Sequence, residues 1–477
     1  MTMLPVALFW GLAAWAMVSR GPALLYLFFA VLPFGSLTAV PPALTGGLSI
    51  LPGPVLGLLL AARYLGDPAG LRFVLSIGLS QRRLLLLTLF WVVALVTTLF
   101  MPRIFAGQVS VVPVREVLYG AQPLVPTSQN ISQFAYLTLS VLMVFTFARI
   151  GRDPALRQHL LAAMVLGAVI AVVTGLLDLA SHFVPISPVL DLFRTATYSI
   201  LADVEVLDQR RVIGLMPEAS SYGGLTIGFL TALYFLAPAI ENQHLRRLAA
   251  PLVGVLVIMA YLSTSSAAYV GLALFAGLAG LHWAGQRLAP GNRARRHVLG
   301  LELALGLGGS AAMVLVILTA PGLFDPVINL VERMVFEKAS SASFEERSYW
   351  TAVSWQALLD SGGVGLGVGS TRASSAPVAV FAATGFLGGL LFYAFVLQSL
   401  SRRALPEPDA AAFLSGIRWS YPAPFIIGAL AGTSANFGAF DAMRFGLAFA
   451  LSTAVLSPAA LRHAAGERRR ALVRRPA

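Results

Sequence analysis

The feature that most constrains this chain is a series of long apolar segments, separated by short stretches that carry most of its charge. A helix needs about 20 mostly apolar residues to cross a bilayer, and lipid offers no water to satisfy the backbone of an open sheet. The apolar segments predict thirteen helices, one of which could enter the bilayer only halfway. The expected ranges are 3–19, 22–34, 46–62, 84–101, 131–148, 158–177, 223–239, 248–262, 267–284, 298–319, 376–399, 419–432 and 440–458.

The sequence therefore predicts an all-α polytopic membrane protein, a bundle of about 12–13 transmembrane helices in a single domain over residues 1–477. Hydrophobic residues make up 57% of the chain and charged residues only 11%. Soluble domains carry about 25% charged residues, so a soluble fold of this chain would leave apolar surface facing water. The chain has no cysteine, which excludes disulfides and thiolate metal sites.

Arginines divide unevenly between the two sides of the predicted bundle. The loops on one side carry Arg63, Arg72, Arg82, Arg83, Arg149, Arg152, Arg157, Arg246, Arg247, Arg287, Arg293, Arg295, Arg296, Arg402, Arg403 and Arg418. The positive-inside rule assigns that side, together with the basic tail over residues 459–477, to the cytoplasm. The net charge of +12 then follows from topology and an anionic leaflet. Nucleic-acid binding is not expected, because it would need arginine clusters on a soluble face.

Three long loops fall on the opposite side of the predicted bundle, over residues 102–130, 178–222 and 320–375. Long loops on a rigid scaffold often carry the chemistry of a protein. The last loop is large and is expected to be partly helical. Its residues 327–335 have the spacing of an amphipathic surface helix. A capping-box pattern over residues 343–346 predicts a second helix, which Ser361-Gly362-Gly363 would end.

Two arginines and one acid stand out in the loop over residues 178–222. Arg210 and Arg211 lie on the side that the positive-inside rule depletes of cations. Glu218 follows Pro217 just before a predicted span, where a carboxylate is favoured by the helix dipole. Glu218 could therefore be a helix-start acid or a functional carboxylate. Arg347 in the large loop is similarly ambiguous, because it could pair within its own helix or bind a ligand.

Alternate glycines over residues 363–369 lead to Arg372. The spacing is similar to a dinucleotide fingerprint, but no strand–helix–strand unit surrounds it. A loop whose backbone closely approaches a ligand or another helix is the better interpretation. Exposed amides of such a loop, with Arg372 beside them, could hold a phosphate. The short turn Ser263-Thr264-Ser265-Ser266 is interpreted as a set of helix caps.

Metal and nucleophile chemistry find little support in the sequence. The six histidines form no HExxH motif, and no Ser-His-Asp arrangement can be assembled on the side of the long loops. We therefore expect neither a metal nor another cofactor. Arginines, one acid and a glycine-rich loop remain, and arginine forks match phosphate oxygens. These residues indicate a site for an anionic lipid headgroup, most simply a diphosphate, at the outer leaflet.

Four motifs occur in order across residues 200–400. They are Arg211-Val212-Ile213-Gly214 with Glu218-Ala219-Ser220; Leu262-Ser263-Thr264-Ser265-Ser266; Glu346-Arg347 with Trp350; and Gly365-Leu366-Gly367-Val368-Gly369-Ser370 followed by Gly385-Phe386-Leu387-Gly388. In this order and topology they resemble the O-antigen ligase and polysaccharide polymerase superfamily of bacterial inner-membrane proteins. Residues 1–200 resemble only a generic membrane bundle.

The resemblance implies a GT-C-like glycosyltransferase whose site faces the periplasm. The donor would be a polyprenyl-diphosphate-linked oligosaccharide, the acceptor a second glycan, and no metal would be needed. Arg210, Arg211, Arg347 and Arg372 would bind the diphosphate, and Arg347 would also act in catalysis. Glu218 would be the general base, or the acid that orients Arg211. A chain-length regulator protein and membrane lipids would be its partners.

Within the superfamily we favour a polymerase of repeat units. Ligases carry a histidine after the glycine-rich stretch, and Arg372-Ala373-Ser374-Ser375 contains none. A ligase that transfers the glycan to lipid A–core remains the alternative. A transporter or flippase is a second alternative, but it would need charges or broken helices near the bilayer centre. Asp178, Glu302 and Asp441 lie instead at predicted helix ends. A membrane partner without activity is a third alternative.

Overall fold

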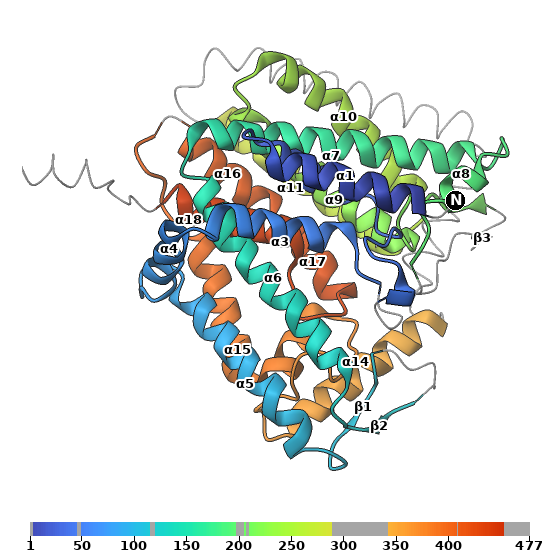
Figure 1. Cartoon of the computed structure of the whole chain (residues 1–477), viewed down its shortest axis with the longest axis vertical. Helices are drawn as coiled ribbons and strands as arrows, with labels where there is room; N and C mark the ends of the chain where they lie inside the picture. Colours follow the sequence, from blue (N-terminus) through green and yellow to red (C-terminus); the bar gives the residue numbers. More distant parts are fainter. Residues whose placement is uncertain are drawn as a thin grey trace, which may run out of the picture.

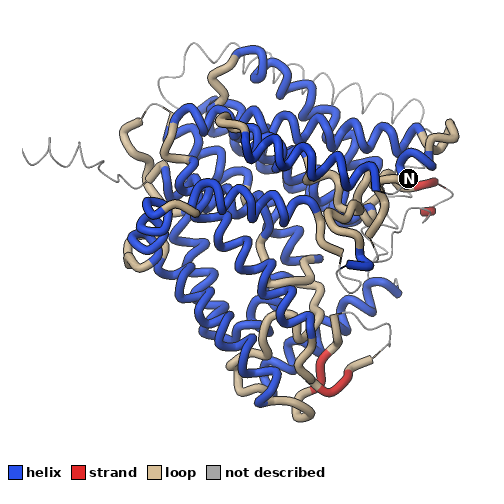
Figure 2. The backbone as a smooth tube through the Cα atoms, in the orientation of Figure 1, coloured by secondary structure: helices blue, strands red, loops and turns tan. Residues whose placement is uncertain are grey.

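The computed structural model describes residues 3–44, 49–114, 120–196, 205–206, 209–288, 342–407 and 409–452. Helices make up nearly all regular structure in this part of the chain (Figures 1 and 2). The two exceptions are short antiparallel pairs, in which β1 (Ser110–Val111) pairs with β2 (Gln122–Pro123) and β3 (Glu205–Val206) pairs with β4 (Gln209–Arg210). The predicted span over residues 298–319, the surface helix over 327–335 and the tail over 459–477 lie outside the described residues.

The helices follow the predicted order closely. Their bounds are α1 (Met3–Val18), α2 (Ala23–Ala30), η1 (Pro42–Leu44), α3 (Pro52–Leu65), α4 (Pro68–Gly78), α5 (Leu85–Ile104), α6 (Ser128–Ile150), α7 (Pro154–Ala180), α8 (Ser187–Asp191), α9 (Ala219–Leu236), η2 (Ala237–Ala239), α10 (Gln243–Leu262), α11 (Ser266–Leu288), α14 (Ala342–Asp360), α15 (Ala376–Leu400), α16 (Ala410–Ser420), α17 (Pro422–Ala431) and α18 (Gly438–Ala450).

Seven helices of the described ranges, α5, α6, α7, α9, α10, α11 and α15, are long and apolar enough to cross a bilayer. The chain is therefore an all-α polytopic membrane protein, as its sequence predicts. Three shorter apolar helices, α1, α3 and α4, accompany these seven. Helix α17 covers most of the expected range 419–432, whereas α16 was not expected from the sequence. The two helices are separated at Tyr421, because Pro422 has no backbone N–H to continue the helical ladder.

Helix α4 was not expected from the sequence. Pro68 stands in its first turn, and the Asp67 carboxylate caps it by accepting from the Gly70 amide at 2.7 Å. Arg72 and Ser76 interrupt its apolar residues, so they do not form a run of about 20 residues that could cross a bilayer. The sequence placed Arg72 in a loop between two spans, whereas Arg72 lies within this helix.

Close helix pairs form the core of the bundle. Helix α18 packs along α6, α15 along α5, α10 along α9, and α2 along α7. Small residues stand at these crossings, as is usual in membranes, where association depends on close packing. A side chain at Gly446 would lie 2.6 Å from the Phe147 Cβ atom, and one at Gly416 would lie 2.6 Å from the Phe235 carbonyl oxygen.

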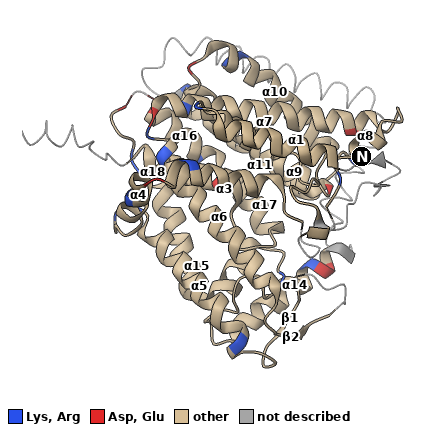
Figure 3. Cartoon of the chain, in the orientation of Figure 1, with Lys and Arg blue, Asp and Glu red and all other residues tan. Residues whose placement is uncertain are grey.

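The bundle has two chemically different ends, shown by the charged residues in Figure 3. At the end that we call the arginine-rich end, contacts join loops that the sequence assigns to one side. Arg149 pairs with Asp67, and Arg157 pairs with Asp409 at 3.1 Å. The opposite end, which we call the loop end, holds α8, α14 and the strand pairs (Figure 1). These contacts bring Arg149 and Arg157 together with the segments before α4 and α16, as the alternate placement predicts, whereas Arg293, Arg295 and Arg296 lie outside the described residues.

Candidate functional site

A kink in α15 shapes the glycine-rich loop at the loop end. Gly385 interrupts the helix with φ of 71° and ψ of 179°, which frees carbonyl groups of the preceding turn. The Leu366 amide donates to the Ala382 carbonyl at 2.8 Å, and the Gly367 amide donates to the Ala383 carbonyl at 2.9 Å. The loop thus satisfies the broken turn of α15 with its own backbone.

The backbone of this loop can approach α15 and α6 so closely only because the residues at the points of contact are glycines without a Cβ atom. Gly365 has φ of 90°, and a Cβ atom there would collide with the Gly385 nitrogen. Near the other end of the loop, a Cβ atom at Gly369 would lie 2.5 Å from the Gln129 carbonyl oxygen on α6. The prediction of close approach to another helix is therefore confirmed.

The amides of the loop are mostly engaged by protein groups. Besides the two that bond α15, the Val368 amide donates to the Thr98 hydroxyl at 3.0 Å. The Arg372 amide donates to the Val112 carbonyl at 2.8 Å, and the Ser374 amide donates to the Thr351 hydroxyl at 3.1 Å. These bonds contradict a phosphate cradle built from exposed amides, so an anion at this place would depend on side chains.

The segment that carries Arg211 is held by a buried carboxylate that sequence reasoning did not select. Asp178, at the end of α7 and only 4% exposed, accepts from the Ile213 amide at 2.7 Å and from the Gly214 amide at 3.0 Å. Its other oxygen pairs with Arg194 at 2.8 Å, and Arg194 also donates to the Gly214 carbonyl at 3.1 Å. Asp178 and Arg194 thereby clamp the segment that precedes α9.

The signal for this clamp was present in the sequence. Asp178 is an acid at the very end of a predicted span, and Arg194 is a cation on the depleted side. Their partnership with backbone amides 35 and 36 residues later depends on the tertiary fold, which no local pattern contains. Arg194 is committed to this clamp, so it is not available to a ligand in the way that the other loop arginines are.

Arg211 projects from this clamped segment onto the serine-rich turn between α10 and α11. Its Nε donates to the Thr264 hydroxyl at 3.1 Å and its Nη2 donates to the Thr264 carbonyl at 3.0 Å. Thr264 has φ of 45°, a left-handed conformation that is uncommon for a β-branched residue. The turn was expected to provide helix caps, and Ser263 does stand at the C-cap of α10, where its hydroxyl donates to the Ala260 carbonyl at 2.7 Å. Thr264 in addition receives and orients the Arg211 guanidinium.

Glu218 occupies the N-cap position of α9, with an extended backbone. The helix-start position that its sequence context predicts is therefore present. Its carboxylate does not cap the helix amides. It accepts instead from the hydroxyls of Ser220 and Ser221, two residues of the first turn. The carboxylate is half-buried and held in place. A carboxylate in this position could orient a neighbouring arginine or accept a proton.

Helix α14 contributes Arg347 and supports Arg372. The helix begins at Ala342, so Ser343 lies inside it rather than before it, and it ends at Asp360 as expected. The Arg372 guanidinium carbon lies 3.7 Å from the centre of the Trp350 ring, a cation–π contact. The Ser354 hydroxyl also donates to the Arg372 carbonyl at 3.0 Å.

Four of the candidate side chains influence one another electrostatically. Burial lowers the pKa of Arg211, while the charge of Glu218 opposes this shift and that of Arg347 adds to it. Burial also lowers the pKa of Arg372, which the charges of Glu346 and Glu218 raise and that of Arg347 lowers. Arg211 and Arg372 nevertheless remain charged at neutral pH. The structure therefore brings Arg211, Glu218, Arg347 and Arg372 into one electrostatic cluster, which we call the site cluster.

Two cavities open beside the site cluster. The first has a volume of about 600 Å³ and lies between α14, α11, α15 and α17. Arg347 lines it together with apolar side chains that include Phe344, Trp355, Val378 and Leu430. An apolar wall with one guanidinium at its edge suits a lipid that carries an anionic headgroup.

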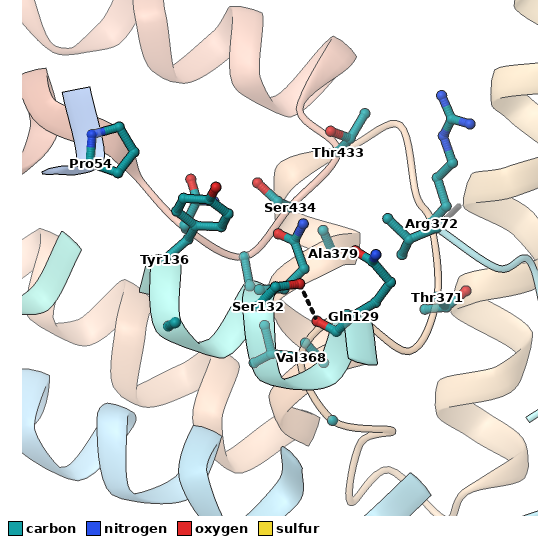
Figure 4. A pocket seen from close by; sticks show the side chains of 18 of the residues that line it. Pro54, Gln129, Ser132, Tyr136, Val368, Thr371, Arg372, Ala379, Thr433 and Ser434 are labelled. Carbon is teal, nitrogen blue, oxygen red and sulfur yellow. Dashed lines mark hydrogen bonds between the residues drawn. The ribbon is translucent and has the colours of Figure 1, made fainter. Parts of the chain in front are cut away.

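The second cavity has a volume of about 830 Å³ and a different chemical character (Figure 4). Gln129, Ser132 and Tyr136 project from α6 toward the segment that carries Ser434, and Arg372 lies at one side. Its other polar lining residues are Ser49, Gln133, Thr371, Thr433 and Asn436. Neutral hydroxyl and amide groups of this kind can donate and accept, as recognition of a sugar requires.

Arg210 is the one candidate that cannot be placed in the cluster. It ends β4, where its backbone pairs with Glu205, but its side chain lies outside the described residues. The described residues contain no group of three or more histidine, aspartate or glutamate side chains that could hold a metal ion.

Comparison with known proteins adds no relative to this description. No family model, curated protein or solved structure matches the chain. The functional conclusion therefore depends on the geometry of the site cluster and on the order of the sequence motifs.

Proposed function

We propose that the chain is a glycosyltransferase of the bacterial inner membrane that polymerises polyprenyl-diphosphate-linked oligosaccharide repeat units on the periplasmic face. One observation carries the proposal. Arg211, Glu218, Arg347 and Arg372 come from segments that are far apart in the sequence, yet they form one electrostatic cluster beside two cavities. The three guanidiniums outnumber Glu218, the one acid of the cluster, and such an excess of positive charge is suited to a polyanionic ligand.

The two cavities divide the proposed substrate into parts of different chemistry. The 600 Å³ cavity offers apolar side chains for the polyprenyl chain, with Arg347 at its edge for the diphosphate. The 830 Å³ cavity offers neutral amides and hydroxyls for the sugars. Arg372 lines the second cavity, so the anomeric carbon would lie where the diphosphate meets the glycan, between Arg347 and Arg372.

The chemistry is a displacement at that anomeric carbon. An acceptor hydroxyl oxygen forms the new bond to the carbon, and the bond from the carbon to the diphosphate oxygen breaks. The electron pair leaves with the diphosphate, where arginine forks stabilise the growing charge. The hydroxyl proton passes to a carboxylate, and Glu218 is the acid of the site cluster that can accept it.

Reconstitution tests this proposal against its alternatives. The purified chain is placed in liposomes with a polyprenyl-diphosphate-linked repeat unit, and the lipid-linked products are separated by length. A polymerase produces a ladder of longer chains on the diphosphate carrier. Transfer to added lipid A–core without a ladder would identify a ligase. Movement of the unchanged glycan across the bilayer would identify a flippase, and either outcome would overturn the proposal.

A deletion strain gives a second, independent result. Loss of a polymerase leaves single repeat units on lipid A–core or on polyprenyl diphosphate. Loss of a ligase instead leaves full-length polymer on polyprenyl diphosphate together with bare core. The absence of a histidine between Arg372 and Ser375 favours the first outcome.

A further inference from the structure

One group of arginines at the arginine-rich end lacks matching acids. It consists of Arg83, Arg149 and Arg152, which we call the arginine cluster. Arg149 pairs with Asp67 at 3.2 Å, but neither Arg83 nor Arg152 forms an ion pair with a described residue. Arg402 borders the cluster, where its Nη2 donates to the Arg83 carbonyl at 2.6 Å. Positive charge therefore exceeds negative charge at this place.

Arg152 lies at the centre of the cluster in an unusual environment. Its guanidinium carbon lies 4.3 Å from the centre of the Phe73 ring on α4 and 5.6 Å from that of Phe449 on α18. Its Nε and Nη2 atoms are buried and have no hydrogen-bond partner among the described residues. Burial, followed by repulsion from Arg83 and Arg149, lowers the pKa of Arg152 to about 10. It is still charged at neutral pH, and its unsatisfied donors are costly without an anion.

Helix α4 places an apolar surface next to this cluster. Leu71, Leu75 and Leu79 are spaced four residues apart and are all more than half exposed. Phe73, on the opposite face of the same helix, contacts Arg152, and the Arg83 guanidinium donates to the carbonyl of Ser76, which follows Leu75, at 3.4 Å. Helix α4 joins the end of α3 to the start of α5, so it lies at the end of the bundle (Figure 1). An amphipathic helix at this level lies in the interface of a bilayer leaflet.

We propose that the arginine cluster binds the phosphate of an anionic phospholipid, whose acyl chains lie along Leu71 and Leu75 of α4 and along Leu79 at its C-cap. The charge of the cluster fits the phosphate, and the leucine stripe fits the chains. A zwitterionic lipid carries its own cation, which the cluster would repel. This site is at the opposite end of the bundle from the site cluster, so the inference does not depend on the proposed enzymatic activity.

Native mass spectrometry of the delipidated full-length chain tests the proposal. The protein is titrated with phosphatidylglycerol and, separately, with phosphatidylcholine that has the same acyl chains. Phosphatidylglycerol is expected to be retained preferentially and to raise the unfolding temperature more. Each of Arg152→Gln and Arg83→Gln should weaken phosphatidylglycerol binding about fivefold, the effect of one basic residue near an anionic surface. Arg103→Gln removes an exposed arginine at the loop end and should leave binding unchanged.

Three results would overturn the proposal. The first is equal retention of the two lipids by the wild-type chain. The second is unchanged phosphatidylglycerol binding in both cluster variants; the use of Arg83→Gln guards against the case in which Arg152→Gln fails to fold. The third is that inorganic phosphate raises the unfolding temperature as much as phosphatidylglycerol at equal concentration, which would indicate a free-anion site without a lipid.

Discussion

At the arginine-rich end several described guanidinium groups join one helix end to another, whereas at the loop end Arg347 lies close enough to Arg211 and Arg372 to repel both. Arg63 donates to the carbonyls of Ala16 at 2.9 Å and Ser19 at 2.5 Å, which ties α3 to the end of α1. Arg157 bonds Glu407 and Asp409 and so ties the start of α7 to that of α16. These arginines stabilise the fold through satisfied contacts.

The arginines of the site cluster have few such contacts. Among the described residues, neither Arg347 nor Arg372 forms an ion pair, and Arg211 bonds only Thr264. Like charges that approach each other without forming ion pairs weaken a fold. A protein keeps such a conflict where function requires it, so the contrast between the two ends distinguishes structural arginines from candidate ligands. The predictions below test that contrast.

The largest effect is expected from Asp178, the structural acid of the loop end. Asp178→Ala leaves Arg194 buried without its partner and removes the acceptor of two backbone amides. We expect the free energy of unfolding to fall by about 3–5 kcal/mol, as for other broken buried pairs. Chemical unfolding in detergent measures it. Asp191→Ala is the matched control, because Asp191 pairs with the same Arg194 but its side chain is 64% exposed.

The control should lose at most about 1 kcal/mol, the range of exposed ion pairs. Equal losses in the two variants would mean that the clamp on residues 213–214 does not depend on burial of Asp178. The rate of the proposed glycosyl transfer should also fall in Asp178→Ala at a temperature where the variant is still folded. The reason is that Arg211 lies just before the clamped amides and loses its position when they are released. An unchanged rate would separate the clamp from the site.

The second prediction compares substitutions of two arginines, Arg347 at the loop end and Arg157 at the arginine-rich end. Arg347→Ala and Arg347→Lys should each lose about 100- to 1,000-fold in transfer rate, the loss seen when one preorganised charge donor is removed. The lysine variant fails as well because an ammonium cannot bind two diphosphate oxygens in the manner of a fork. The unfolding free energy should stay within about 0.5 kcal/mol of the wild type.

Arg157→Ala is the counterpart at the arginine-rich end. It should lose about 1.5–3 kcal/mol of stability, the range for hydrogen bonds to charged groups. Its transfer rate, measured on folded protein, should remain unchanged. If Arg347→Ala keeps full activity or Arg157→Ala loses activity without losing stability, the contrast between the two ends is wrong.

The third prediction concerns the glycine-rich loop that holds the site cluster in place. Gly365 has φ of 90°, and Gly365→Ala would place a Cβ atom against the backbone of Gly385. We therefore expect the free energy of unfolding to fall by about 1–3 kcal/mol. Gly224→Ala on α9 has open space and a helical backbone, and should be neutral or stabilising by about 0.4–1 kcal/mol. Thermal unfolding compares the two. Equal stability of both variants would refute the close packing of this loop on α15.

The fold was largely predictable because apolar length alone identifies spans in a membrane. The ranges for α5, α6, α7 and α15 differ from the prediction by only a few residues. Helix α4 escaped because its apolar residues do not form a run long enough to cross a bilayer. The division at Tyr421 escaped because a proline within a long apolar segment is compatible with either a kink or a break. Helix α4 and the break at Tyr421 both depend on the helices that pack around these segments, which the local sequence does not contain.

The residues of the candidate site could be predicted from the sequence, but only some of the contacts between them could. Arg211, Glu218, Arg347 and Arg372 were selected from charge on a depleted side and from short motifs, and the structure brings them together. The support of Arg211 by Thr264 was not predictable, because 53 residues and the whole of α10 separate the two. Local patterns identify which residues are chemically unusual, whereas the tertiary fold determines which of them meet.

The final prediction concerns the orientation of the two ends and should hardly perturb the protein. Gln81→Cys at the arginine-rich end and Gln108→Cys at the loop end replace exposed residues in a chain that has no other cysteine. An impermeant thiol reagent, added to intact cells with a permeabilised outer membrane, should label Gln108→Cys and leave Gln81→Cys unmodified until the cells are lysed. The expectation follows from the positive-inside rule, which keeps the arginine-rich end in the cytoplasm. The reverse pattern would place the site cluster in the cytoplasm, where a periplasmic polymerase could not act, while the structural contrast between the two ends would remain.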